Sequence, residues 1–343
     1  MKILVCGFHR RRLPDIYLES FVCRLARFYL EKSEIHQVVF LTGEEGLPGV
    51  PEKAVLLEVK QSGSLLGRLW EKKSIRQMIR QQNPDIVLSM DTGFAPHGID
   101  EFVIITQDLK NADRAKKNGK AVFLSHYLRD SFRTGSSSPV LPLQGGVFFQ
   151  PVDWDERETI KQQYTDGREY FFCSAFHTSL EQVTIVLKAF SMFKKWQNSS
   201  VKLLISETGG LHEALQKLLA HYKYRGDVVI FSSNDIEEEA RVAVASFAVV
   251  YLPADDYTGL RVLNYLQADL PVFTCEAGAI REMAGDGVIY CDKNSVEDIA
   301  TKLKTIYKDE KFRSRVTGSG RLALQEKIKE FEARRTVMQF PLG

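Results

Sequence analysis

The sequence predicts an α/β protein made of two halves, each built around a mostly parallel β-sheet. Short apolar runs alternate along nearly the whole chain with longer stretches whose apolar residues recur at helical spacing. The length of 343 residues is enough for two domains, each with its own core. A segment rich in Ser, Gly and Pro at 134–158 interrupts the alternation, and a new series follows it.

In the first half, Ile3–Cys6 is a short apolar run ended by Gly7, whereas Ile16, Phe21 and Leu25 fall on one face of a helix. The same reasoning predicts strands at 3–6, 38–41, 86–88, 103–106 and 121–124, and helices at 16–29 and 64–82.

In the second half, the pattern predicts strands at 170–173, 201–205, 228–231, 248–252, 272–274 and 288–290. Helices are expected near 180–195, 211–222, 235–243, 259–268 and 296–307, and a charged helix over 308–335. We therefore expect a first domain at 1–145, a second at 146–320, and a final helix at 321–343 that packs back on the first.

The charge balance excludes a general nucleic-acid binder, because 46 Lys and Arg face 44 Asp and Glu, for a net charge of +2. Residues 1–150 are the basic part, with 21 basic and 16 acidic side chains. Much of that excess lies in 110–133. This segment is either a contact for an anionic membrane or a phosphorylated acceptor, or simply a charged helix face with a connector.

The five cysteines show no short metal-ligand spacing, which indicates reduced, mostly buried thiols and no metal site. The start, MKILVCGFHRRR, is too short in its apolar part for a signal peptide. No run approaches the ~18 apolar residues of a membrane span. The expected location is the cytoplasm, with any membrane contact peripheral, at the inner face.

Several motifs in consecutive order resemble the donor-binding half of GT-B glycosyltransferases, particularly the retaining family 4 type. They are PLQGGVFFQPVDWDERE at 142–158, YFFCSAFHTSLEQVTIVLKAF at 170–190, LLISETGG at 203–210, DDYTGLRVLNYLQADLPVF at 255–273 and EAGAIREMAGDGVIYCD at 276–292. The resemblance implies two Rossmann-like domains with a cleft between them. It also implies sugar transfer from a nucleotide-sugar donor, UDP or GDP sugar, to a glycan or lipid-linked acceptor, without metal or other cofactor and with retention.

The resemblance also implies where the site lies. Asp256 and Asn264 stand at the two positions of the family's E-x7-E pair, so Asp256 would face the sugar and Asn264 the ribose. Gln107 stands where the family often has a cleft histidine, and Asp256 and Gln107 are therefore the catalytic candidates. The family's two phosphate-binding cations fall on Phe176 and Glu181, which cannot neutralise a phosphate.

We expect other charged side chains and backbone N–H groups near these two positions to contact the diphosphate. Arg261 and His177 are the nearest charges, and the backbone N–H groups of Gly209 and of Ala277, Gly278 and Ala279 precede predicted helices. Each has a structural alternative: a glycine before a helix is a common turn or cap, Arg261 suits a solvated helix face and His177 an ordinary loop.

On the acceptor side, Gly7, His9 and Arg10 follow the first strand, where this fold places acceptor or diphosphate contacts. A solvated basic loop is the alternative. Two functions stay open at this stage: an active glycosyltransferase, which the order of the motifs favours, and a catalytically inactive relative that serves as partner or scaffold of an active glycosyltransferase.

Overall fold

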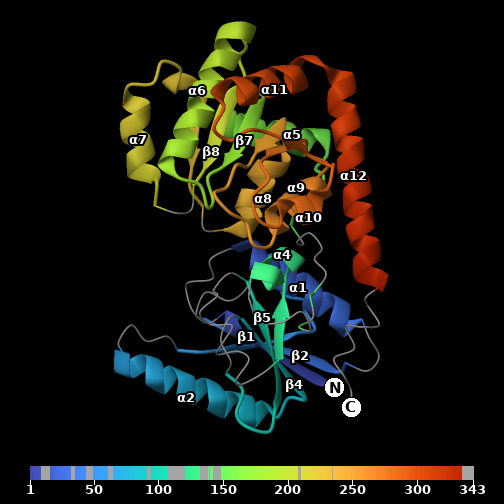
Figure 1. The fold of residues 1–343 in the computed structure, drawn as a ribbon. Coiled ribbons are helices and arrows are strands. Elements are labelled where there is room, and N and C mark those ends of the chain that lie inside the picture. The colour runs from blue at the N-terminus through green and yellow to red at the C-terminus, as the bar shows by residue number, and fades with distance from the viewer. Residues whose placement is uncertain are drawn as a thin grey trace. The chain divides into compact units, whose positions relative to one another are not determined.

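A computed structural model describes residues 1–8, 16–31, 35–43, 49–60, 65–90, 94–106, 120–131, 138, 140–141, 148–207, 210–233 and 235–333. The chain divides into two compact units, Met1–Val147 and Phe148–Gly343. Each unit contains one six-stranded sheet in the described residues, and every strand pair in both sheets is parallel (Figure 1).

The first sheet has the strand order β3-β2-β1-β4-β5-β6. Its strands are β1 (Lys2–Phe8), β2 (Gln37–Thr42), β3 (Val55–Glu58), β4 (Ile86–Met90), β5 (Asp100–Ile105) and β6 (Lys120–Phe123). The helices of this unit are α1 (Ile16–Leu30), α2 (Leu65–Gln82) and α4 (His126–Ser131). β3 and α4 were not expected from the sequence.

The core of the first unit forms where α2 packs on one face of the sheet. Ile75 and Ile79 of α2 are buried in one cluster with Leu4, Val39 and Val87. These three residues come one from each of the neighbouring strands β1, β2 and β4. β1 continues through Gly7 to Phe8 instead of ending at Gly7, and its pairing with β2 shifts register between Val5 and Phe8. A glycine inside a strand commonly accompanies such an irregularity.

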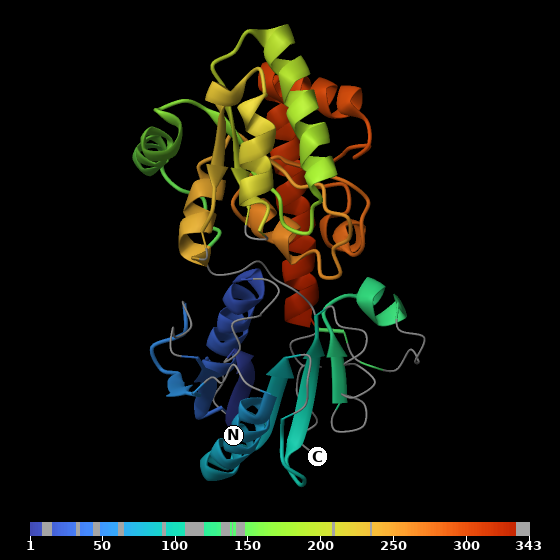
Figure 2. The same cartoon turned by 90° about the vertical axis from the view of Figure 1, so that its left-hand side faces the viewer.

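The second sheet has the strand order β12-β11-β10-β7-β8-β9. The helices of this unit surround it (Figure 2). Its strands are β7 (Tyr170–Ser174), β8 (Lys202–Ser206), β9 (Val228–Phe231), β10 (Ala248–Val250), β11 (Val272–Thr274) and β12 (Ile289–Tyr290). The helices are α5 (Trp154–Thr165), α6 (Leu180–Gln197), α7 (His212–Ala220), α8 (Ile236–Val244), α9 (Leu260–Gln267), α10 (Ile280–Ala284), α11 (Val296–Lys308) and α12 (Glu310–Ala333), with a short 3-10 turn at Arg225–Asp227.

Side-chain caps fix where several of these helices begin. Asp153, Ser179 and Ser295 are the N-caps of α5, α6 and α11, and each accepts a hydrogen bond from the backbone N–H three residues later. α5 was not expected, because the linker was thought to extend to residue 158.

α12 packs against α9, α10 and α11 of its own unit. Gly320 on α12 permits the close approach, since a Cβ there would lie 2.9 Å from the Leu266 side chain and 3.2 Å from the Gly287 carbonyl. The predicted packing of 321–343 on the first half stays a prediction, and 334–343 lie outside the described residues.

All five cysteines lie buried, as expected. Burial raises the pKa of the Cys173 and Cys291 thiols to about 12, so both are neutral side chains of the core. Within the part of the chain that the structure describes, no helix is both long enough and apolar enough to cross a lipid bilayer.

Candidate functional site

The carboxylate of Asp256 organises the loop between β10 and α9, at the carboxyl edge of the second sheet. Its Oδ1 accepts hydrogen bonds from the backbone N–H groups of Thr258 (3.0 Å) and Gly259 (2.8 Å) and from the Thr258 hydroxyl (3.3 Å). Its Oδ2 accepts one from the buried Tyr251 hydroxyl at 3.1 Å. Oδ1 of the predicted sugar-facing carboxylate therefore holds the backbone that leads into α9, and Oδ2 holds the Tyr251 side chain at the end of β10.

A second loop is bonded to the same residue. The Ala279 backbone N–H donates to the Asp256 carbonyl at 2.7 Å. Gly278 has φ +59°, and a Cβ there would lie 2.0 Å from the same carbonyl, so only glycine fits. We call this arrangement of Asp256, Thr258, Gly259, Gly278 and Ala279 the Asp256 junction. It joins the β10–α9 and β11–α10 loops.

The predicted backbone donors are partly engaged inside the chain. Besides Ala279, the Ala277 N–H donates to the Cys275 carbonyl at 2.9 Å. A diphosphate oxygen can accept a hydrogen bond from the Ala277 or Ala279 N–H only if that group is shared with its carbonyl partner.

Arg261 is buried and faces the interior of its unit. Its side chain is 2% exposed, and its Nη1 lies 3.3 Å from Oε1 of the equally buried Glu239 on α8 and 3.3 Å from the Ser174 hydroxyl. The guanidinium carbon lies 3.7 Å from the centre of the Phe176 ring. Phe176 occupies the position of a family cation. Its ring therefore stacks on Arg261, the nearest candidate to replace that cation.

His177 and Glu181 lie on the surface beside this stack. The His177 ring stacks on Phe176 at 4.1 Å between centres, and His177 has a left-handed backbone with φ 51°. Its carbonyl accepts from the Ala254 N–H at 2.9 Å, which ties the β7–α6 loop to the loop after β10. Glu181 is exposed in the first turn of α6, where an acid complements the helix dipole.

Asn264 lies on α9 one turn after Arg261, with no exposed surface. The structure therefore brings Asp256, Arg261, Asn264 and His177 to one end of the second unit, around the start of α9. Only His177 of these four is exposed.

Sequence reasoning missed Lys293, which follows β12. Its Nζ donates to the carbonyls of Pro253 (3.4 Å) and Ala254 (3.3 Å). Its own carbonyl accepts from the Gln182 side chain in the first turn of α6 at 2.5 Å. Lys293 is thus a half-buried cation between the N-terminus of α6 and the loop after β10.

Burial raises the pKa of the nearby Cys275 thiol, and the positive charge of Lys293 opposes that shift. The only sequence signal for Lys293 is its position just after an edge strand, at the carboxyl end where parallel sheets bind ligands.

Four predicted site residues, His9, Arg10, Gln107 and Gly209, lie outside the described residues. Half of the basic segment 110–133, namely residues 110–119 and 132–133, does too. Among the His, Cys, Asp and Glu side chains of the described ranges, no group of three or more is arranged to hold a metal ion.

The second unit matches a known family. Residues 155–322 fit the family model described as "Glycosyl transferases group 1". These residues form a group 1 glycosyl transferase domain. A comparison with curated proteins finds no match to the sequence.

Solved structures share the fold. WaaG, a glycosyltransferase involved in lipopolysaccharide biosynthesis, is similar with a TM-score of 0.69 and 14% identity, over 94% of this chain and 95% of that chain. A glycosyltransferase from Rickettsia africae ESF-5 has the same score and identity over 99% and 98%. Alr3699/HepE from Anabaena, solved with UDP and glucose, gives 0.71 and 12% over 98% and 99%.

These similarities confirm the α/β class and the GT-B fold of two Rossmann-like domains. The glycosyltransferase assignment that the sequence favoured is confirmed at the level of the family. The roles of individual site residues stay predictions.

The buried pair Arg261–Glu239 yields a stability prediction. Arg261→Met alone leaves the Glu239 carboxylate buried without its cation, so we expect a loss of about 3–5 kcal/mol in the free energy of unfolding. The double variant Arg261→Met/Glu239→Met removes both charges and should recover most of that loss. Urea unfolding of the full chain measures both. A double variant that is as unstable as the sum of the two single variants would contradict a paired structural role.

Proposed function

We propose that this chain is an active glycosyltransferase that moves a sugar from a UDP- or GDP-linked donor to a glycan or lipid-linked acceptor. The observation that carries the proposal is the group 1 domain at 155–322 with a cation, Lys293, at the carboxyl edge of its sheet. The likeness to Alr3699/HepE, whose structure contains UDP and glucose, supports a nucleotide-sugar donor.

The chemistry requires positive charge near the departing diphosphate, because negative charge accumulates on it as the bond to the sugar breaks. We assign this task to Lys293, with His177 as a second donor. Both are attached to residue 254: Lys293 through its Nζ and His177 through its carbonyl. The first turn of α6, beside Lys293, adds the partial positive charge of a helix N-terminus.

Lys293 can leave its carbonyl partners for a phosphate. Its contacts to Pro253 and Ala254 are long, at 3.4 and 3.3 Å. A phosphate oxygen carries more charge than a carbonyl oxygen, and a charge-assisted bond to it is stronger. The ammonium group needs only a side-chain rotation to make the exchange, because Lys has four flexible side-chain bonds.

We assign Asp256 a positioning role. Four hydrogen bonds hold its carboxylate, so it is poorly suited to attack a sugar carbon and well suited to fix the start of α9. The buried Arg261 supports the β7–α6 loop, which holds Phe176 and His177, by stacking on the Phe176 ring. The resemblance to family 4 supports a retaining reaction without a protein nucleophile and without a metal, and we include both in the proposal. Asn264 as a ribose contact and Gln107 as a catalytic contact remain part of the proposal.

Lys293 provides the test of donor binding. UDP or GDP titrated into the full chain by calorimetry should bind saturably, and Lys293→Ala should weaken binding by about tenfold to a hundredfold, the worth of a charged hydrogen bond. Lys293→Arg should retain part of the affinity. Lys304→Ala, an exposed lysine on α11, is the matched control and should bind like the unaltered protein.

The inactive-partner alternative makes the opposite prediction. Glu181 in place of a cation and the engagement of Arg261 with Glu239 favour it. No saturable binding of either nucleotide would support a scaffold for another glycosyltransferase. Binding that is unchanged in Lys293→Ala would overturn only the assignment of the cation.

We further propose that α2 carries the peripheral contact with an anionic membrane, where a lipid-linked acceptor would lie. Trp70 is 70% exposed on α2, with Lys73 5.3 Å from its ring. Arg76 and Arg80 follow on the exposed side of the helix, and Glu71 is buried. Tryptophan and basic residues together suit the interface of an anionic bilayer.

Vesicle sedimentation checks the membrane contact. Arg76→Ala/Arg80→Ala should lower binding to phosphatidylglycerol-containing vesicles by roughly thirtyfold, at about 1 kcal/mol per basic residue. Trp70→Ala should lower it as well. Trp154→Ala is the matched control, because Trp154 is 72% exposed on the second unit but is flanked by Asp153 and Asp155. Equal binding by all four proteins would refute the proposal.

A further inference from the structure

The second unit contains a pocket of about 380 Å³ at the amino edge of its sheet. Its floor comes from residues that precede β10 and β11, namely Phe247, Leu270 and Pro271. One wall comes from α12. Because every strand of this sheet is parallel, the amino edge is opposite the carboxyl edge that holds Lys293 and the Asp256 junction. We call this cavity the amino-edge pocket.

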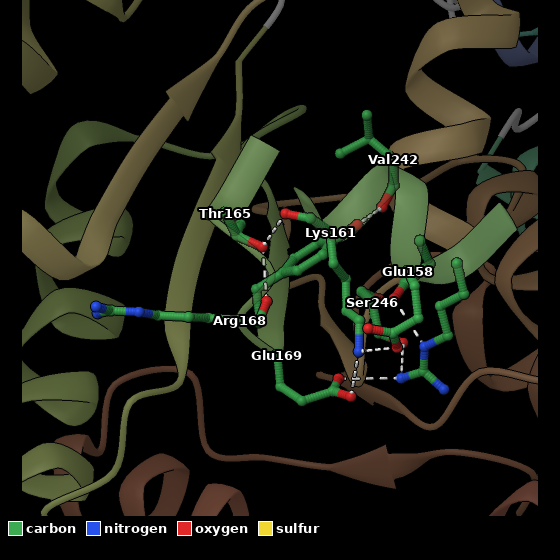
Figure 3. A network of polar contacts seen from close by, with 10 residues as sticks. Glu158, Lys161, Thr165, Arg168, Glu169, Val242 and Ser246 are labelled. Carbon is green, nitrogen blue, oxygen red and sulfur yellow. Dashed lines mark hydrogen bonds and ion pairs between the residues drawn. The ribbon is translucent and has the colours of Figure 1, made fainter. Parts of the chain in front are cut away.

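The two carboxylates that line the pocket are already paired. Glu169 lies 3.1 Å from an Arg157 nitrogen and 2.9 Å from the Lys161 ammonium group. Figure 3 shows Glu169, Lys161 and Ser246 gathered at this end of the unit. Both oxygens of Asp269 accept from Arg321, at 2.6 and 3.0 Å. The acids therefore do not repel an anion from the pocket.

Arg313 adds a third guanidinium group to the lining, and it is held ready for a ligand. Its central carbon lies 4.7 Å from the centre of the Phe247 ring. A guanidinium stacked on an aromatic ring keeps its in-plane N–H groups available for the paired oxygens of a phosphate or carboxylate. Its ion pair with Glu310 is long, at 3.9 Å, and Glu310 is exposed.

Two hydroxyl side chains of α12 line the pocket together with this guanidinium. Ser314 and Thr317 line the same wall, on the face of α12 that carries Arg313 and Arg321. Ser246 also lines the pocket. It is 2% exposed, and its hydroxyl has no hydrogen-bond partner within the described part of the chain. That oxygen is itself buried, so it lies behind the lining of the pocket and not on its surface.

From this geometry we propose that the amino-edge pocket binds a small molecule with a phosphoryl group, held by Arg313 together with Ser314 and Thr317 of the same helix. A phosphoryl group has three terminal oxygens and needs more donors than a carboxylate does, and this pocket is lined by the Arg313 guanidinium and by the hydroxyl side chains Ser314 and Thr317. The apolar floor of Leu270 and Pro271 suits the uncharged part of the molecule. The volume is within the range of small-molecule sites.

The probe is glucose 1-phosphate, titrated by calorimetry into the full chain with UDP present in excess. The UDP keeps a sugar phosphate from being mistaken for a donor-site ligand. We expect saturable binding that is weakened at least about tenfold by Arg313→Ala, which loses a charge-assisted pair of hydrogen bonds. Arg313→Lys keeps the charge but not the planar fork, and it should bind with intermediate affinity. Arg315→Ala, an exposed arginine on the same helix, is the matched control.

Two results would overturn the proposal: no saturable binding of glucose 1-phosphate, or equal affinities in Arg313→Ala and Arg315→Ala. Glucuronate, the carboxylate counterpart, should bind more weakly, and equal binding would overturn the preference for a phosphoryl group. UDP affinity should be the same in all three arginine variants, so failure of this site and failure of the donor site are distinguishable. Circular dichroism checks that each variant is folded.

Discussion

The hydrogen bonds of Asp256 are the constraint on which the rest of the donor-side geometry depends. Its carboxylate binds the backbone N–H groups of Thr258 and Gly259, just before α9, and its carbonyl accepts from the Ala279 N–H of the next loop. α9 in turn carries Arg261 and Asn264, so one residue fixes the position of both. Gly278 is required because any Cβ there would collide with that same carbonyl. Asp256 stands at a family position associated with sugar contact, and here its hydrogen bonds join two loops.

Charge at this edge is distributed differently from the family pattern. Arg261 lies inside the unit, where it pairs with Glu239 and stacks on the Phe176 ring, because a buried guanidinium needs an acid beside it to offset the loss of hydration. Phe176 and Arg261 are therefore one feature: the aromatic ring covers the cation. Lys293, a residue from another loop, places a half-buried positive charge at this edge and contacts the loop that follows β10.

The amino-acid sequence predicts the fold well where periodicity is strong. The apolar runs around Val87, Phe172 and Val249 are strands, and the amphipathic stretches around Ile75 and Val186 are helices, because a buried strand or helix face needs just such patterns. β3 was missed because its four residues alternate between half-buried and exposed positions. α5 was missed because its residues are mostly polar, although Asp153 followed by Glu156 is a helix-start signal.

The site was less predictable than the fold, for a physical reason. Motif order located the loops, but the direction of a side chain depends on partners far away in the chain. Arg261 points inward because Glu239 lies on another helix, and Lys293 reaches Ala254 across some forty residues. Spacing within a motif carries no information about such pairs. The amino-edge pocket is likewise assembled from Phe247 and Arg313, which no local pattern connects.

A crystal structure of the full chain grown with UDP, and another with GDP, tests the central claim most directly. We expect a nucleotide at the carboxyl edge of the second sheet, with a diphosphate oxygen within hydrogen-bond distance of the Lys293 ammonium group and Asp256 still bonded to Thr258 and Gly259. A nucleotide whose diphosphate is bound away from Lys293, or an empty site at saturating concentrations of both nucleotides, would contradict it.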